Sequence, residues 1–179
     1  AIILETITGN NGVWMPSKEW YQNIQKFCNT NNIFLILDEV ICGFKRTGPD
    51  FGFMHYKDLK PDMICLAKAI TGGIIPFGAI WTHQRIAKHS KRNTLACGLT
   101  NYAHPLGLAA LDGVLDLIES PLFLKQHKEL IEKFTETLKK FNKKKSILEI
   151  RQIGLLAALD FSKDFTLPTW SEFQKNGVY

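Results

Sequence analysis

The sequence predicts an α/β fold with a mostly parallel sheet, on the basis of two observations. In the first part of the chain, apolar segments of strand length and a helical segment follow in the order strand, helix, strand. Parallel strands need a long crossover connection, usually a helix, so this order favours a parallel α/β unit. In addition, residues 33–37 form a continuous apolar run, which is typical of a strand buried inside such a sheet.

Local signals predict the elements of this unit. A short strand is expected at residues 2–4, and a turn, GNNG, separates it from a helix within residues 15–30. Ser17 is expected to cap this helix, with Glu19 in its positively charged first turn. The run at residues 33–37 is then the second strand, and the two strands flank the helix.

Two more short apolar runs predict strands at residues 63–67 and 77–81. The first of them follows the turn signal KPD and ends directly before Lys68. Residues 41–62 contain several glycines and prolines and no sustained helical period. A loop of this length in a compact domain is usually functional or disordered, so this segment is a candidate functional loop.

The second half of the sequence is predicted to be helical before it returns to strands. An alanine-, glycine- and leucine-rich pattern predicts a helix at residues 102–119, and a second, amphipathic helix follows Ser120 and Pro121. Strand-like segments then lie at residues 147–153 and 155–161. No internal repeat interrupts this order.

The change of pattern near residues 98–121 predicts a domain boundary. We expect residues 1–98 to belong to a large domain, 99–120 to form a connecting helix, and 121–179 to begin a smaller C-terminal domain. Because the chain opens at Ala1 inside a predicted strand, we expect it to be a fragment of a longer protein.

Composition excludes several classes of protein. The chain has 179 residues and 45% hydrophobic content, which is enough to bury one sizeable core. No apolar run approaches the roughly 20 residues of a membrane span, and the first residues lack the features of a signal peptide. The four cysteines are scattered, without paired spacing. From the cysteines we expect reduced thiols, no metal site and a cytoplasmic location. From the lack of a long apolar run we expect no membrane partner.

The formal net charge of +5 raises the alternative of a basic nucleic-acid-binding domain. Much of the excess lies in KKFNKKK, residues 139–145. Apolar residues recur at three- and four-residue steps between Leu124 and Phe141, so we interpret these lysines as the solvated face of an amphipathic helix. Since no recognisable nucleic-acid-binding motif is present, we expect no nucleic-acid partner.

An acid and an amine follow two of the predicted strands. Asp38 comes directly after the buried run, and Lys68 follows the next run in the same way. Ligands of open α/β sheets bind just outside the carboxyl ends of the parallel strands, so the two side chains would face one crevice if these strands are neighbours. The alternative is an ion pair that only satisfies itself.

Four ordered blocks of the sequence resemble one family. They are ILETITGNNGV, LILDEVICGFKRTG, LAKAITGG with the PFGAI that follows it, and GLTNYAHPLGLAAL. They are similar to blocks of the class III, or omega, aminotransferases that use pyridoxal phosphate, and DEVICGF looks most like the omega-amino acid:pyruvate branch. The resemblance implies the three-layer, mostly parallel sheet of the large cofactor-binding domain of fold type I, followed by the start of a smaller α+β domain.

The resemblance also implies roles for residues at the strand ends. Lys68 would be the catalytic residue, which forms a Schiff base with the cofactor and carries a proton as general acid and base. Asp38 would pair with the protonated pyridine nitrogen, which makes the ring an electron sink. Val40, two residues along on the same strand face, would pack against the ring; the alternative is an ordinary core valine.

Other matching positions are given roles in the same way. Thr100 resembles a threonine that binds the cofactor phosphate across a dimer interface, near the start of a helix; the alternative is a plain helix cap. Glu5 is similar to a glutamate near the substrate site, and Ile41 stands where the ornithine and 4-aminobutyrate branches tend to carry glutamine. Glu39 and Arg46 are interpreted as scaffold or interface residues.

The function implied by the resemblance is transfer of an amino group from an amine or omega-amino acid to a keto acid, in a homodimer with cofactor sites at the interface. The same chemistry leaves two rivals open, an adenosylmethionine-8-amino-7-oxononanoate aminotransferase and a glutamate-semialdehyde aminomutase. A non-catalytic fragment that acts as a dimerisation or binding module is the alternative from another class. The presence of both Asp38 and Lys68 argues against it.

Overall fold

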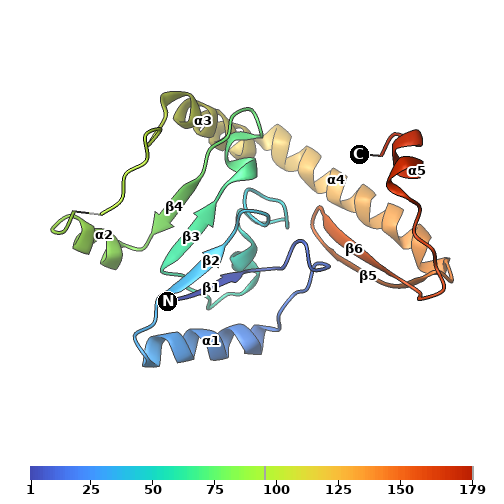
Figure 1. Cartoon of the computed structure of the whole chain (residues 1–179), viewed down its shortest axis with the longest axis horizontal. Helices are drawn as coiled ribbons and strands as arrows, with labels where there is room; N and C mark the ends of the chain where they lie inside the picture. The colour runs from blue at the N-terminus through green and yellow to red at the C-terminus, as the bar shows by residue number, and fades with distance from the viewer. Residues whose placement is uncertain (95, 179) are drawn as a thin grey trace.

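The structure, a computed structural model, describes residues 1–94 and 96–178. Its main element is a four-stranded sheet (Figure 1). In order across the sheet, the strands are β1 (Ile2–Glu5), β2 (Leu35–Asp38), β3 (Met63–Leu66) and β4 (Ala79–Thr82). The first three strands are parallel, and β4 runs antiparallel to β3. The predicted strands are therefore confirmed, within one or two residues at their ends.

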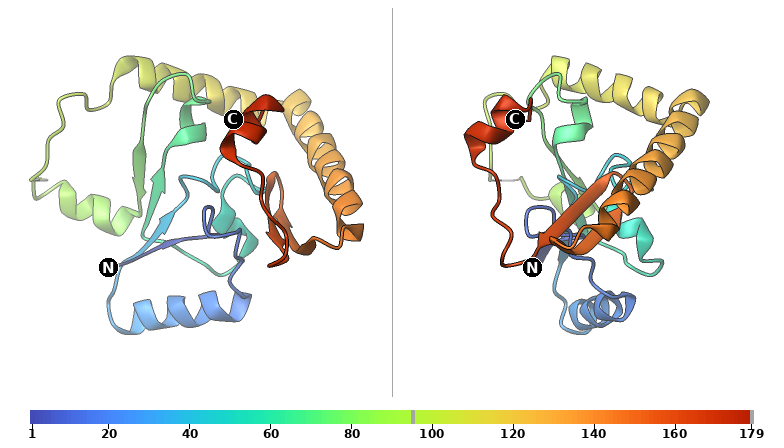
Figure 2. Two further views of the ribbon diagram at one scale, coloured as in Figure 1. Left: turned by 45° about the vertical axis from the view of Figure 1, so that its right-hand side comes forward. Right: turned by 90° about the vertical axis from the view of Figure 1, so that its right-hand side faces the viewer.

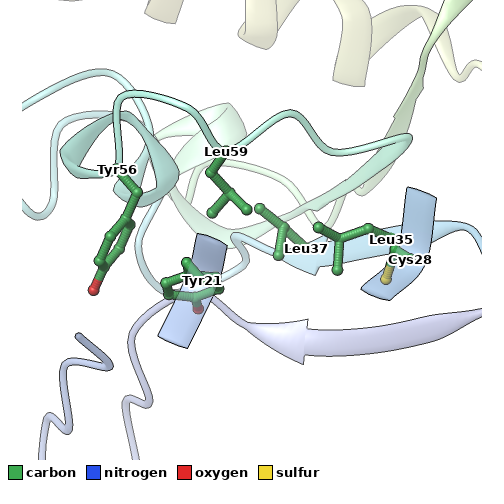
Figure 3. Close-up of a cluster of buried hydrophobic side chains, with 6 residues drawn as sticks. All are labelled: Tyr21, Cys28, Leu35, Leu37, Tyr56 and Leu59. Carbon is green, nitrogen blue, oxygen red and sulfur yellow. The ribbon is translucent and has the colours of Figure 1, made fainter. Parts of the chain in front are cut away.

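Helix α1 (Lys18–Thr30) connects β1 to β2 and covers one face of the sheet (Figure 1). It begins where the sequence predicts, because the Ser17 side chain accepts a hydrogen bond from the amide of Trp20. The core between this helix, β2 and the loop after β2 is shown in Figure 3 and consists of Tyr21, Cys28, Leu35, Leu37, Tyr56 and Leu59. Burial of these side chains fixes the helix on the sheet.

The register of the parallel strands decides which residues share the other face. Glu5 lies opposite Asp38, and Asp38 lies opposite Cys65. Paired residues point to the same face of a sheet, and alternate residues point to opposite faces. Since Leu35 and Leu37 face α1, the three paired residues lie on the face that α1 does not cover. Ile3 and Ile80, which have the same parity, are 60% and 64% exposed.

Three helices follow the sheet, α2 (Gln84–Ser90), α3 (Pro105–Glu119) and α4 (Pro121–Lys139). Among the helices that the structure describes, none has both the length and the apolar composition that crossing a bilayer requires. The lysines of residues 139–145 lie at the end of α4 and just beyond it, and all are exposed. This agrees with a solvated position, although it is the helix end rather than its side.

The predicted start of α3 at Tyr102 is wrong. The helix begins at Pro105, and the His104 side chain caps it by accepting a hydrogen bond from the amide of Leu106. Proline is favoured in the first turn of a helix and disfavours helical conformation in the residue before it. Ala103 has a φ of 46°, which is left-handed and incompatible with a continuous helix.

The chain then forms a two-stranded antiparallel hairpin of β5 (Ile147–Ile153) and β6 (Leu156–Phe161). The hairpin lies beside the loops that follow β1 and β2 (Figure 2), where Ile153, Leu156 and Ala158 pack against Ile7, Val13 and Cys42. A last helix, α5 (Trp170–Lys175), was not predicted. Its signal was present, since Thr169 and Glu172 form a capping box.

Two glycines of α3 provide a matched test of how this helix packs. A Cβ at Gly107 would lie 2.2 Å from the Phe77 ring, whereas nothing lies within 4 Å of one at Gly113. Gly113→Ala should therefore raise the free energy of unfolding by roughly 0.5–1 kcal/mol, because alanine favours the helix. Gly107→Ala should instead lower it by about 1–3 kcal/mol, since the ring must move. Denaturant unfolding of both variants measures the difference, and equal effects would contradict this packing.

Candidate active site

The sheet brings the ends of β2 and β3 to the same edge. These strands are parallel neighbours, and Asp38, the last residue of β2, pairs with Cys65, three residues before Lys68. Parallel strands open their carboxyl ends on one side of the sheet, which is where α/β proteins bind ligands. Asp38 and Lys68 therefore follow adjacent strand ends, as the sequence predicts.

Asp38 has one carboxylate oxygen occupied and one available. Its Oδ1 accepts a hydrogen bond of 2.9 Å from the amide of Val40. Its Oδ2 accepts none from the part of the chain that the structure describes. The side chain is half-buried, and a carboxylate in this state can accept a charge-assisted hydrogen bond from a cationic N–H group.

The prediction that Val40 lies on the same strand face as Asp38 is wrong. The strand ends at Asp38, and Val40 lies in the turn that follows. Strand periodicity therefore does not determine where its side chain points. Its backbone has a defined function, since the Val40 amide orients the Asp38 carboxylate. A packing contact of the valine side chain with a ring remains a prediction.

Lys68 is exposed and forms no ion pair within residues 1–94 and 96–178. A self-satisfying pair with Asp38 is therefore not formed. Lys68 also opens a short 3₁₀ helix (Lys68–Thr71) with a φ of 51°. Such a left-handed conformation costs about 1 kcal/mol or more for a residue with a side chain, and it is frequent at functional sites.

Glu39, next to Asp38, is buried and holds the loop that follows β2. Its carboxylate accepts hydrogen bonds from the Thr6 hydroxyl at 2.5 Å and from the amides of Gly52 and Phe53 at 2.7 and 2.8 Å. Burial raises the pKa of this carboxyl, and the three hydrogen bonds oppose that rise. Glu39 therefore supports the site, in agreement with the scaffold interpretation. The contribution of Thr6 was not predicted, because no local pattern indicates a partner 33 residues away.

Glu5 and Ile41 meet at one glycine. Glu5 is exposed at the end of β1, where its Oε2 accepts a hydrogen bond of 2.8 Å from the amide of Gly9. A Cβ at Gly9 would lie 2.4 Å from Cδ1 of Ile41, so Ile41 packs directly on this backbone. The structure thus brings Glu5, Ile41 and Asp38 to one edge of the sheet. Contacts of Glu5 and Ile41 with a substrate remain predictions.

Thr100 lies in an exposed turn of the segment that connects α2 to α3. The expectation that it stands near the start of a helix is wrong, because α3 begins at Pro105 and His104 is the cap. Its hydroxyl therefore does not belong to the α3 N-terminus. The predicted contact of Thr100 with a phosphate across an interface does not depend on this helix and remains a prediction.

The chemistry of these groups fits an organic cofactor. Among the described residues, no group of three or more histidine, cysteine, aspartate or glutamate side chains is placed to hold a metal. An accessible amine and a carboxylate with an available oxygen match a cofactor that carries an aldehyde and a basic ring nitrogen. Lys68 and Asp38 would hold such a group from two adjacent strand ends.

Comparisons with known proteins show which proteins this chain resembles. A model of the family described as Aminotransferase class-III matches residues 1–179. The chain is 33% identical over 167 residues to gamma aminobutyrate transaminase 3, chloroplastic, of Solanum lycopersicum, a match that covers 90% of this chain and 32% of that protein. It is 31% identical over 183 residues to the beta-alanine–pyruvate aminotransferase of Pseudomonas aeruginosa, covering 97% of this chain and 40% of that protein.

Solved structures are similar as well. Taurine:2-oxoglutarate aminotransferase from Bifidobacterium kashiwanohense, in complex with PLP and glutamate, superposes with a TM-score of 0.83 at 34% identity. The match covers 89% of this chain and 36% of that structure. This similarity confirms the fold class predicted from the sequence. The chain spans between 32% and 42% of the length of the first curated relatives that it matches.

The Glu39 network can be tested by one substitution. Glu39→Gln keeps the volume but places an amide group against a backbone N–H or the Thr6 hydroxyl, so at least one hydrogen bond is lost. The free energy of unfolding should fall by about 1–3 kcal/mol. Denaturant unfolding measures this change, with Glu136→Gln on the exposed side of α4 as the control. If both variants have wild-type stability, Glu39 does not hold the loop.

Cys42 should be chemically inert in the folded chain. Burial, followed by the charge of Glu39, raises the pKa of its thiol to about 11. Only the thiolate is alkylated, so iodoacetamide at pH 8 should modify Cys42 about a hundredfold more slowly than in urea. Peptide mapping by mass spectrometry measures both rates. Cys97, which is exposed, is the control and should react at a similar rate in both states.

Proposed function

Because this chain belongs to the class III aminotransferase family, we propose that the complete protein is a pyridoxal-phosphate-dependent transaminase. It moves an amino group from an amine or omega-amino acid to a keto acid. The observation that carries this proposal is the position of an accessible lysine and an aspartate with an available oxygen after adjacent parallel strands. This arrangement is less consistent with a non-catalytic module, which would need neither group.

The roles of the two residues follow from the atoms that they present. Lys68 would hold the cofactor through its amine, and the same amine would move a proton at the reacting substrate carbon as general base and general acid. Asp38 would hold a proton on the cofactor ring nitrogen, and the hydrogen bond from the Val40 amide to Oδ1 keeps the carboxylate oriented. The cofactor itself supplies a ring that withdraws electrons from that carbon.

Substrate selection is assigned to the edge beside Asp38. Glu5 would meet a cationic group of the substrate, and Ile41, which packs on the backbone of Gly9, would provide an apolar contact. One relative that matches this chain is named a beta-alanine–pyruvate aminotransferase and another an omega-amino acid–pyruvate aminotransferase. These names support an omega-amino acid as donor and pyruvate as acceptor.

The assembly is proposed on the same family basis, and the location on the scattered cysteines, which favour an intracellular compartment. We infer a homodimer in which Thr100 binds the phosphate of the partner's cofactor, which suits its exposed position on a connecting segment. Residues 1–98 form part of the cofactor-binding domain, and residues 121–179 begin the smaller domain. The complete protein would act in the cytoplasm, although two plant relatives are named as chloroplastic and mitochondrial.

Substitution of Lys68 tests the proposed function. The complete protein should take up pyridoxal phosphate and show the absorbance of the bound cofactor at the edge of the visible range. Borohydride should then attach the cofactor to the peptide that contains Lys68, as seen by mass spectrometry. Lys68→Ala should abolish this attachment and lower kcat by at least about a thousandfold, because the proton carrier is lost.

The control is Lys60→Ala, since Lys60 is exposed and is separated from Lys68 by β3. It should keep both cofactor uptake and activity. A complete wild-type protein that never binds pyridoxal phosphate would overturn the proposal. Attachment of the cofactor to another lysine would overturn the role of Lys68 alone.

A further inference from the structure

A buried arginine of the hairpin joins two parts of the chain that are far apart in sequence. Arg151 of β5 is only 7% exposed. Its guanidinium donates two hydrogen bonds of 2.8 Å to Asp160 and is also paired with Glu149. A buried arginine of this kind is held rigidly, because its planar fork matches the carboxylate in two places.

The remaining contacts of Arg151 reach the loop after β1, residues 8–14. Its Nε donates a hydrogen bond of 2.6 Å to the carbonyl of Gly12. Its guanidinium also lies 4.3 Å from the centre of the Trp14 ring, as a cation–π contact. Together with the packing of the hairpin on Ile7 and Val13, these contacts clamp the loop from one side.

The backbone of this loop is strained, so contacts from other segments must stabilise its conformation. Val13 has a φ of 55°, which is a rare conformation for a β-branched residue. Within the loop, Thr8 and Trp14 exchange two hydrogen bonds of 3.1 Å. Such a conformation persists only where the surroundings determine it. Arg151 supplies the contact from outside the loop to its tip.

Gly9, near the start of the same loop, contacts Glu5 and Ile41, the two residues proposed to face the substrate. The amide of Gly9 donates a hydrogen bond to the Glu5 carboxylate, and the Ile41 side chain packs against the backbone of Gly9. Gly9 and Gly12 are themselves joined, because the amide of Gly12 donates to the carbonyl of Gly9 at 3.4 Å. A continuous set of contacts therefore leads from Arg151 to Glu5 and Ile41.

We propose that Arg151 is a positioning residue, which orients Glu5 and Ile41 for the amino donor through the loop of residues 8–14. This inference rests on the proposed function, since it concerns the substrate side of that site. Arg151 lies on the hairpin and acts through Gly12, so it touches neither Asp38 nor Lys68 in the described chain. Its loss should weaken recognition of the donor while cofactor binding is kept.

The test uses the complete protein with pyridoxal phosphate and an omega-amino acid donor. Arg151→Met should raise the KM for the donor about tenfold, as expected for the loss of one well-placed interaction, with kcat and cofactor absorbance within about twofold of wild type. Arg151→Lys keeps the charge beside Asp160 but lacks Nε. Thermal stability should therefore be lower than wild type in Arg151→Met and close to wild type in Arg151→Lys. The KM for the donor should stay raised in both variants.

A double substitution separates positioning from a general structural effect. If Arg151 acts through Glu5 and Ile41, the rise in KM of Arg151→Met combined with Glu5→Gln should be smaller than the product of the two single effects. The matched control is Arg85→Met, because Arg85 also pairs with a carboxylate, Asp62, and lies over an aromatic ring, Phe34, but belongs to α2. It should leave KM unchanged.

The outcomes distinguish the two proposals. A wild-type protein that neither binds the cofactor nor transfers an amino group refutes the proposed function. An active wild type with an unchanged KM in Arg151→Met refutes the positioning role. The role is equally refuted if the effects of Arg151→Met and Glu5→Gln multiply, or if Arg151→Lys restores KM together with stability.

Discussion

The buried carboxylate of Glu39 is the constraint on which the site depends. It joins the residue after β1, Thr6, to the loop after β2 at Gly52 and Phe53 through three hydrogen bonds. A buried carboxylate is stable only when its oxygens are satisfied, so these three segments must keep their places. The strand end next to it is thereby fixed, and Asp38 presents its available oxygen on the face that α1 leaves open.

The two loops that border the site are also held from the far end of the chain. Arg151 clamps the loop after β1. In the loop after β2, the carbonyls of Lys45 and Arg46 accept hydrogen bonds from the ring of His127 in α4 and from the amide of Leu155. Phe44 and Lys45 of this loop have left-handed backbone conformations. Contacts distant in sequence thus hold conformations that local sequence does not favour.

Local signals account for the elements that were predicted correctly. Ser17 caps α1 and residues 33–37 contain β2, because capping and continuous apolar runs depend on neighbours in the sequence. The apolar pattern predicts α3 from residue 102, whereas Pro105 defines its first turn. Val40 was assigned by strand periodicity, which the turn after Asp38 ends. The capping box of Thr169 and Glu172 is a local signal for α5.

The sequence by itself determined the chemistry available to this protein. The order of strand and helix, and an acid and a lysine at successive strand ends, need only local pattern and the rule that parallel strands share a carboxyl edge. Tertiary structure alone decided which acid is buried and which is open, since Asp38 and Glu39 are adjacent and differ only in their surroundings. It alone brought Arg151 to the loop after β1 as well, because a contact across 139 residues depends on packing and leaves no local trace.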